Sequence, residues 1–301
     1  MFPPVVSGDT VALATPERVT LVDISSAKPE TIAVIDIAPT TQPTIAGSVL
    51  LVTTRSTLRA FALATGSEEW RLDTTYRSTP LAAFDSSIVA TTRDRLHRID
   101  GETGTVRWES DIGSGVDGIA ADPRRIVINQ GRGSGSGSRV VGVDIANGER
   151  QWTGEAEHSD LPPLLGEQVL TVSEYGRVSI RDGGSLRTVT ETEVLSPRAA
   201  AATDSFVVVG PGVDGTYAGV DLGTETLRWE VRLQGGGRPI VDGTTVFVPV
   251  RSDGIVVLDP ESGVVRRQVA VDGLRNGLVP VSDGLLCFDG PGDRVSLVNS
   301  E

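Results

Sequence analysis

The chain has 301 residues, of which 39% are hydrophobic and only 4% aromatic, and it contains 35 glycines and 17 prolines. This composition is typical of many short β-strands joined by tight turns, and it disfavours disorder and collagen. The formal net charge of −13 disfavours binding to nucleic acid, because affinity for a phosphate backbone depends on a cationic surface. No transmembrane segment is predicted, and the single cysteine, Cys287, excludes an intrachain disulfide and a multi-cysteine metal site.

The cationic residues are unusual in kind, because Lys28 is the only lysine and the other 26 of the 27 are arginine. A high acidic load with almost no lysine resembles that of proteins from salt-loving archaea, in which carboxylates keep proteins soluble in brine. We therefore expect a halophilic archaeal origin. Two compartments stay open: the cell envelope or surface, if a signal or lipid anchor has been removed from the chain, and otherwise the cytoplasm.

A repeat of about forty residues recurs along the chain, most clearly at Ala60–Trp70, Arg98–Trp108 and Gly142–Trp152. Aligning the repeats on the position of their aspartate gives eight copies, at Asp23, Ala62, Asp100, Asp144, Arg181, Asp221, Asp259 and Asn299. The distances between successive copies are 39, 38, 44, 37, 40, 38 and 40 residues. A period near forty is typical of one β-propeller blade. The spacing of 44 arises from Gly131–Ser138, a flexible insertion that precedes a strand and not the helix a phosphate loop requires.

Each repeat contains four candidate strands, A to D, and strand A is expected to lie nearest the axis. In the seventh repeat these are Pro239–Val241, Val246–Val250, Gly254–Leu258 and Arg266–Ala270. We therefore predict an all-β fold, an eight-bladed β-propeller of four-stranded antiparallel meanders with a three-stranded last blade. It would form one domain over residues 1–301, with blades at about 5–36, 37–73, 74–111, 112–157, 158–193, 194–233, 234–271 and 272–301.

The pattern Ala-x-Asp-x-x-Thr-Gly-x-x-x-Trp resembles the tryptophan-docking repeat of the pyrroloquinoline-quinone (PQQ) type propellers, within the wider WD40-like superfamily. The resemblance implies that the tryptophan of each repeat packs between neighbouring blades against a close-approaching glycine. Repeats without it, at Thr31, Val189 and Arg267, would have looser contacts. The docking residues it implies are Trp70, Trp108, Trp152 and Trp229.

The same resemblance leaves two functions open. Long members of the family are quinoprotein dehydrogenases that hold PQQ and calcium beside a vicinal disulfide, which one cysteine cannot form. Shorter members resemble the BamB type, which are lipoprotein scaffolds without a cofactor, and the length of this chain matches them better. No catalytic residue, metal site or cofactor is predicted, because His97 and His158 are the only histidines and the Asp-Gly pairs are typical of hairpin turns.

The meander topology allows charges to be sorted by face, since the A–B and C–D turns share one face while the B–C and D–A loops share the other. The first face is acidic, whereas arginines gather on the second. Arginine suits carboxylates and phosphates, so this second face is the predicted binding site for a protein or an anionic small molecule. The residues concerned are Arg55, Arg77, Arg93, Arg198, Arg238, Arg251 and Arg275. The alternative is that arginines there pair with the nearby Asp94, Asp160, Asp253 and Asp293.

We therefore expect a monomeric, non-catalytic scaffold that binds a protein or a ligand. Two alternatives stay open, a quinone-dependent or sugar-dependent oxidoreductase and a sensor domain of a larger membrane protein.

Overall fold

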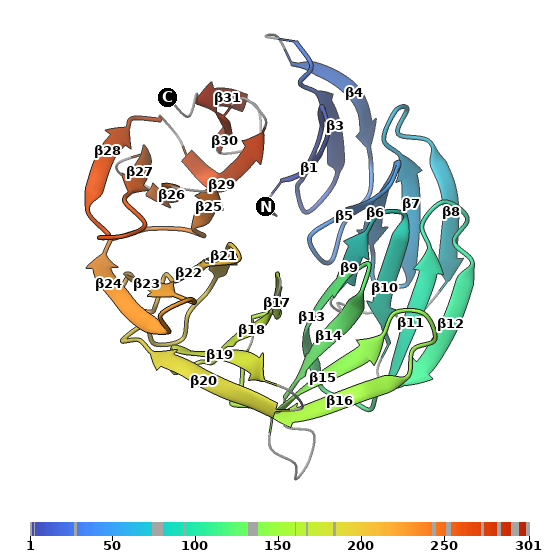
Figure 1. Ribbon diagram of the computed structural model, residues 1–301. Helices are drawn as coiled ribbons and strands as arrows, with labels where there is room; N and C mark the ends of the chain where they lie inside the picture. Colours follow the sequence, from blue (N-terminus) through green and yellow to red (C-terminus); the bar gives the residue numbers. More distant parts are fainter. Residues whose placement is uncertain are drawn as a thin grey trace.

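The computed structural model describes residues 2–298 except 3, 27–28, 74–80, 93, 132–137, 160, 167, 183–184, 243–244, 251–253, 272–273, 282–283 and 290–294. The described strands form separate antiparallel sheets that follow one another in chain order around a central axis (Figure 1). The first strand of each sheet lies innermost, and successive inner strands are in contact. No helix within the described ranges has the length and apolarity that a membrane span requires.

The first four sheets are four-stranded meanders. Blade 1 contains β1 (Val5–Ser7), β2 (Thr10–Ala14), β3 (Val19–Asp23) and β4 (Glu30–Ile35). Blade 2 contains β5 (Thr44–Ala46), β6 (Val49–Thr53), β7 (Thr57–Ala62) and β8 (Glu68–Asp73). Blade 3 contains β9 (Leu81–Phe84), β10 (Ser87–Thr91), β11 (Arg95–Asp100) and β12 (Val106–Asp111). Blade 4 contains β13 (Val116–Asp122), β14 (Arg125–Gln130), β15 (Arg139–Asp144) and β16 (Arg150–Glu155).

Three further sheets have the same order, and a shorter sheet follows them. Blade 5 contains β17 (Leu164–Leu165), β18 (Val169–Val172), β19 (Arg177–Asp182) and β20 (Ser185–Glu191). Blade 6 contains β21 (Ala200–Ala202), β22 (Phe206–Val209), β23 (Thr216–Asp221) and β24 (Thr226–Arg232). Blade 7 contains β25 (Ile240–Asp242), β26 (Thr245–Val250), β27 (Gly254–Leu258) and β28 (Val265–Val269). The last sheet contains β29 (Leu274–Val281), β30 (Gly284–Asp289) and β31 (Val295–Val298).

The expectation of an eight-bladed propeller of four-stranded meanders is corrected by this topology. Seven sheets have the complete four-stranded blade form, so the fold is a seven-bladed propeller of four-stranded antiparallel sheets. The eighth repeat contributes the three-stranded sheet β29–β30–β31, with no fourth strand among the described residues. Counting repeats in the sequence overestimated the number of blades. Strands A to C are enough for a repeat to be recognised, whereas a complete blade also needs the outer strand D.

The hydrophobic core is divided into clusters that lie between neighbouring sheets. Strand B of each blade is buried on both faces, so consecutive residues belong to different clusters: Leu50 packs towards blade 1 and Leu51 towards blade 3. Likewise, Ile126 packs towards blade 3 and Val127 towards blade 5. Because successive side chains of a strand point to opposite faces, burial on both sides requires an uninterrupted apolar run. This explains the β-branched runs that mark every repeat.

The outer rim is held by contacts between strand D of one blade and the C–D turn of the next. The indole Nε1 of Trp70 donates to the carbonyl oxygen of Gly101 at 2.7 Å, and that of Trp108 donates to Ile145 at 3.0 Å. Trp229 donates to Pro260 at 2.8 Å. Trp152 packs differently, with the Arg181 guanidinium of the next blade 4.6 Å from its ring centroid. Each indole therefore joins two blades by packing and by a polar contact.

A glycine in the C–D turn of the next blade receives Trp70, Trp108 and Trp229. Gly104 has a φ of +70°, and a Cβ atom added to it would lie 2.7 Å from the Trp70 ring. In the first blade the structure places Ala33, and not Thr31, against Gly66. The turn glycine therefore supplies both a left-handed backbone and the space for the neighbouring side chain.

The junction between blades 5 and 6 lacks both partners of this contact. Val189 of β20 packs in the cluster between these blades, and Glu225 takes the turn position with a φ of +58°. Arg187 of β20 instead donates from both of its terminal nitrogens to the two Glu225 carboxylate oxygens, each at 2.6 Å. At the outer rim, blades 5 and 6 are therefore joined by an ion pair, whereas an indole packed on a glycine joins the blades at other junctions.

The aspartate of the repeat closes the same turn. Asp100 accepts hydrogen bonds from the Thr103 backbone N–H at 3.0 Å and from Arg107 at 2.5 Å. The Arg107 guanidinium, together with Thr103, lowers the pKa of Asp100 to about 2. In the seventh blade, Arg266 is the main cause that lowers the pKa of Asp259 to about 2.

We predict that Gly104→Ala destabilises the fold more than Gly8→Ala does. Both glycines have a positive φ, so both variants carry the left-handed penalty of about 1 kcal/mol, but nothing lies within 4 Å of a Cβ at Gly8. At Gly104 the Trp70 ring must also move, which adds about 1–3 kcal/mol. Urea unfolding of the two variants measures the difference, and equal losses of stability would contradict the docking role.

We predict that the stability of the fold declines as the pH falls from 3.8 towards 2. The pKa of Asp100 and that of Asp259 lie near 2 in the folded chain, below the reference value of 3.8, so the unfolded chain takes up protons first. Thermal unfolding midpoints between pH 6 and pH 2 measure this decline. The double variant Asp100→Asn/Asp259→Asn should show a shallower decline, and parallel curves for the two proteins would refute the explanation.

Candidate binding face

The antiparallel meanders place all B–C and D–A connections at one end of the ring, which we call the loop face. The predicted arginines map to these connections: Arg55 lies between β6 and β7, Arg198 between β20 and β21, and Arg238 between β24 and β25. Arg198 and Arg238 therefore flank blade 6, whereas Arg55 lies in blade 2. All three therefore lie on the loop face, but only Arg198 and Arg238 lie in neighbouring D–A connections.

The described arginines of this set are exposed and make no ion pair with any residue in the described ranges. The alternative of pairing with nearby carboxylates stays a prediction, because Asp160, Asp253 and Asp293 lie outside the described residues. Arg275 lies on β29, where only the backbone is described. The remaining predicted positions lie outside the described residues, and these are Arg77, Arg93 and Arg251.

Three large apolar side chains are exposed in neighbouring loops of the loop face. Val213, Tyr175 and Leu195 have 62%, 57% and 53% of their surface exposed. They come from the B–C turns of blades 5 and 6 and from the loop between these blades. We call Tyr175, Leu195 and Val213 the apolar patch. A contiguous exposed apolar surface is typical of a site that contacts another molecule.

Backbone hydrogen bonds fix the three loops of the apolar patch to one another. The Ser196 N–H donates to the carbonyl of Glu174 at 2.7 Å, and the Val213 N–H donates to that of Leu195 at 3.0 Å. Arg198 follows in the same loop, where its N–H donates to Pro211 at 3.0 Å. The patch is thus held in place by main-chain contacts and has an exposed guanidinium beside it.

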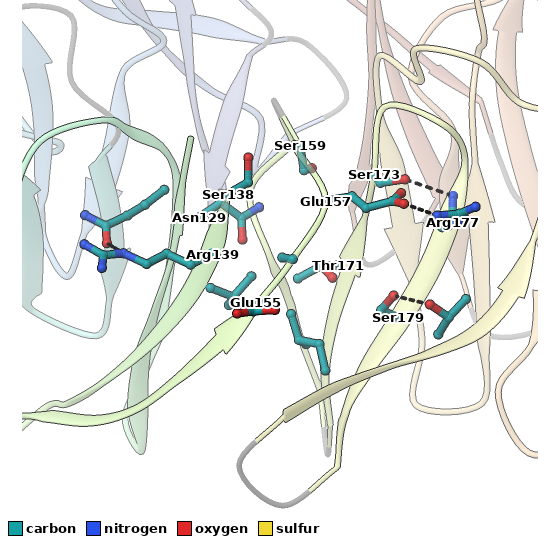
Figure 2. A pocket seen from close by; sticks show the side chains of 15 residues that line it. Asn129, Ser138, Arg139, Glu155, Glu157, Ser159, Thr171, Ser173, Arg177 and Ser179 are labelled. Carbon is teal, nitrogen blue, oxygen red and sulfur yellow. Dashed lines mark hydrogen bonds and ion pairs between the residues drawn. The ribbon is translucent and has the colours of Figure 1, made fainter. Parts of the chain in front are cut away.

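A polar pocket of about 300 Å³ opens between blades 4 and 5 on the same face. Figure 2 shows its labelled side chains on the facing edges of the two blades. Most of its lining residues are hydroxyl-bearing, amide-bearing or charged, and the lining consists of Asn129, Gln130, Ser138, Arg139, Val140, Glu155, Ala156, Glu157, Ser159, Thr171, Ser173, Arg177, Ser179, Leu186 and Thr188. The last residue of the predicted insertion, Ser138, and the residue that precedes the insertion, Gln130, are among them.

Arg177 organises one wall of the pocket. Its guanidinium pairs with Glu157 and, at 2.8 Å, with Glu191, and these two carboxylates raise its pKa, Glu157 contributing most. The Ser173 hydroxyl accepts hydrogen bonds from the backbone N–H groups of Tyr175 and Arg177, both at 3.2 Å. The turn that exposes Tyr175 is therefore built on a pocket residue, so the apolar patch and the pocket adjoin each other.

Several polar groups of the pocket have no hydrogen-bond partner within the described residues. Asn129 is only 4% exposed, and its Nδ2 donates to the Leu161 carbonyl at 2.6 Å, which leaves its Oδ1 unpaired. Glu157 Oε2 is also buried and unpaired. Because an unmet buried acceptor carries a desolvation cost, such groups mark a place where another molecule can donate.

The two histidines lie in different parts of the ring, His97 within β11 and His158 in the connection between β16 and β17 on the loop face. His97 is buried in β11, and burial lowers its pKa, although Glu109 lies 3.9 Å away. His158 Nδ1 lies 3.8 Å from Asp117 Oδ2. Over the described ranges, no group of three or more His, Cys, Asp or Glu side chains could hold a metal ion.

The apolar patch and the pocket were missed by the sequence prediction, which followed charge alone. The sequence could have indicated the patch, because Tyr175, Leu195 and Val213 are large apolar residues in segments that connect strands. The pocket gave no local signal, since its two walls come from different repeats.

Comparisons with known proteins support the family as well as the fold. The family model described as "Outer membrane protein assembly factor BamB" matches residues 54–211, which is more than half of the chain. A search of curated proteins finds no match to the sequence.

Solved structures resemble the chain over almost its whole length at low identity. BamB from Moraxella catarrhalis is 19% identical, with a TM-score of 0.75 over 97% of this chain and 92% of that one. The computationally designed Ika8 protein is 17% identical, with a TM-score of 0.76 over 98% of this chain and 95% of that one. Quinohemoprotein alcohol dehydrogenase ADHIIG from Pseudomonas putida HK5 is 13% identical, with a TM-score of 0.65 over 96% of this chain and 69% of that one.

These structures share the propeller fold although one is BamB, one is a designed protein and one is an alcohol dehydrogenase, so the likeness shows the fold alone. The family model is more specific, because it matches the repeats that carry Trp70, Trp108 and Trp152 and both walls of the polar pocket. The chain therefore belongs to the family of the outer membrane protein assembly factor BamB.

Proposed function

We propose that this chain is a non-catalytic scaffold whose loop face binds a segment of a partner protein. The observation that carries the proposal is the apolar patch, in which Tyr175, Leu195 and Val213 each expose more than half of their surface. Burying such side chains against a partner removes apolar area from water, which is the main favourable term in protein association.

The arginine beside the apolar patch indicates that the partner carries a carboxylate. Arg198 is exposed, shares a loop with Leu195, and has no ion-pair partner in the described part of the chain. A partner segment that presents apolar side chains followed by a carboxylate would satisfy both features, since a guanidinium binds carboxylates in a two-pronged geometry. The rest of the surface repels acidic partners through the net charge of −13, so this face would supply the local attraction.

The family membership supports the same proposal, because the matching family is described by a factor that assembles membrane proteins. The likeness to an alcohol dehydrogenase favours the alternative of a PQQ-dependent oxidoreductase. A spectroscopic titration separates the two: PQQ with calcium should leave the absorbance of the mixture equal to the sum of its parts if the chain is a scaffold. A cofactor band that appears only with the protein would favour the enzyme.

We predict that Val213→Asp abolishes retention of the partner, whereas Val264→Asp does not. Both valines are 62% exposed, but Val264 lies in the C–D turn of blade 7, on the opposite face. A charge in the apolar patch should weaken binding by about tenfold or more, because interface centres tolerate buried charge poorly. Immobilised wild-type and variant proteins, incubated with extract of the source organism, measure the retained partner by mass spectrometry. Equal retention by the two variants would contradict the site.

A further inference from the structure

The pocket between blades 4 and 5 has features of a small-molecule site that the apolar patch does not need. Its volume of about 300 Å³ lies at the lower end of the range for ligand pockets. Ten of its fifteen lining residues lie on strands, which are β14, β15, β16, β18, β19 and β20, and the other five lie in the adjoining connections. Strands therefore hold most of its walls. A site built on strands is positioned in advance, which reduces the cost of ordering it around a ligand.

Two deeply buried polar side chains in this pocket have hydrogen-bonding capacity that no described residue uses. Asn129 Oδ1 is an unpaired acceptor on a side chain that is 96% buried. Thr171 is 94% buried, and its hydroxyl has no hydrogen bond to another described residue. Both residues line the pocket, and Figure 2 shows them in its interior. Together they present an acceptor and a hydroxyl to whatever occupies the space.

The charges of the pocket balance, which limits the charge of the occupant. Two arginines, Arg139 and Arg177, face two glutamates, Glu155 and Glu157. Arg139 donates from Nε to Gln130 at 2.8 Å, and Arg177 is held by its carboxylates. An anion would meet Glu155 and the unpaired Glu157 Oε2, and a cation would meet both guanidinium groups. Neither sign of charge is favoured in this pocket.

A neutral molecule with several hydroxyl groups fits these demands. Each hydroxyl donates one hydrogen bond and accepts others, so one such group can satisfy Asn129 Oδ1 while another meets Thr171 or the remaining proton of Ser173. We infer that the pocket between blades 4 and 5 binds a neutral polyhydroxyl ligand, a sugar or a polyol of about monosaccharide size. This inference does not depend on the proposed partner protein, because the apolar patch and the pocket share no residue.

Saturation-transfer NMR on the full chain tests the inference with a matched set of probes. Glucose, galactose and mannose are the neutral probes, glucosamine is the cationic probe and glucuronate the anionic one. At least one neutral sugar should bind with a Kd on the order of 1 mM, as expected of a small polar ligand. The charged sugars should bind roughly tenfold more weakly, because each meets a like charge in the pocket.

A pair of valine variants links binding to the pocket. Thr171→Val removes the hydroxyl without changing the shape of the side chain and should weaken sugar binding about tenfold. Thr53→Val is the control, since Thr53 also lies on a B strand, is 2% exposed and has an unpaired buried hydroxyl, but lies outside the pocket. Thr53→Val should leave sugar binding unchanged. Thermal unfolding verifies that both variants are folded, and Ser138→Ala replaces Thr171→Val if the latter does not fold.

Three results would overturn the inference. The first is that none of the three neutral sugars binds, which would mean that the pocket holds only water. The second is tighter binding of glucosamine or glucuronate than of any neutral sugar. The third is unchanged sugar binding in Thr171→Val, or in Ser138→Ala where it is used. Loss of partner retention in Val213→Asp with unchanged sugar binding would show that the two sites are separate.

Discussion

Packing of each sheet between two others is the interaction on which the rest of this structure depends. Strand B of a blade has no solvent-facing side, so residues such as Leu50 and Leu51 enter the cores on opposite sides of one sheet. Burial of apolar area is thereby divided among many small clusters and not gathered in one centre. Each blade is stabilised by its neighbours, which is why the chain needs many copies of a unit that could not fold alone.

The rim shows how one geometric requirement can be met in more than one way. A large side chain and a glycine that leaves room for it form a pair across a blade boundary, as Trp70 and Gly104 do. Where the chain has Val189 in place of the indole, the receiving turn carries Glu225, and Arg187 pairs with it. An exposed ion pair contributes about 0.5 kcal/mol, less than a buried indole, so this junction has the weaker rim contact.

The same two blades carry the apolar patch, on the face opposite the C–D turn that holds Glu225. The apolar patch lies on blades 5 and 6, and the polar pocket lies between blades 4 and 5. Residues in the loops of this face do not have to pack in the core, because the strands already bury the apolar residues that stabilise the ring. The patch can therefore carry exposed apolar groups, and the pocket can carry unpaired polar ones, without loss of the fold.

The sequence by itself determined the period, the order of strands within a blade, the positions of the docking tryptophans and the division of loops between two faces. These are local properties, since alternation along a strand and turn residues act within one repeat. Tertiary structure decided what depends on pairs of repeats. The number of complete blades is seven and not eight, because an outer strand has to pair with its sheet and counting aspartates does not test this. The pocket exists because Asn129 and Thr171, 42 residues apart in the sequence, face each other across a blade boundary. Whether a buried polar atom has a hydrogen-bond partner can be seen only when the residues around it are placed.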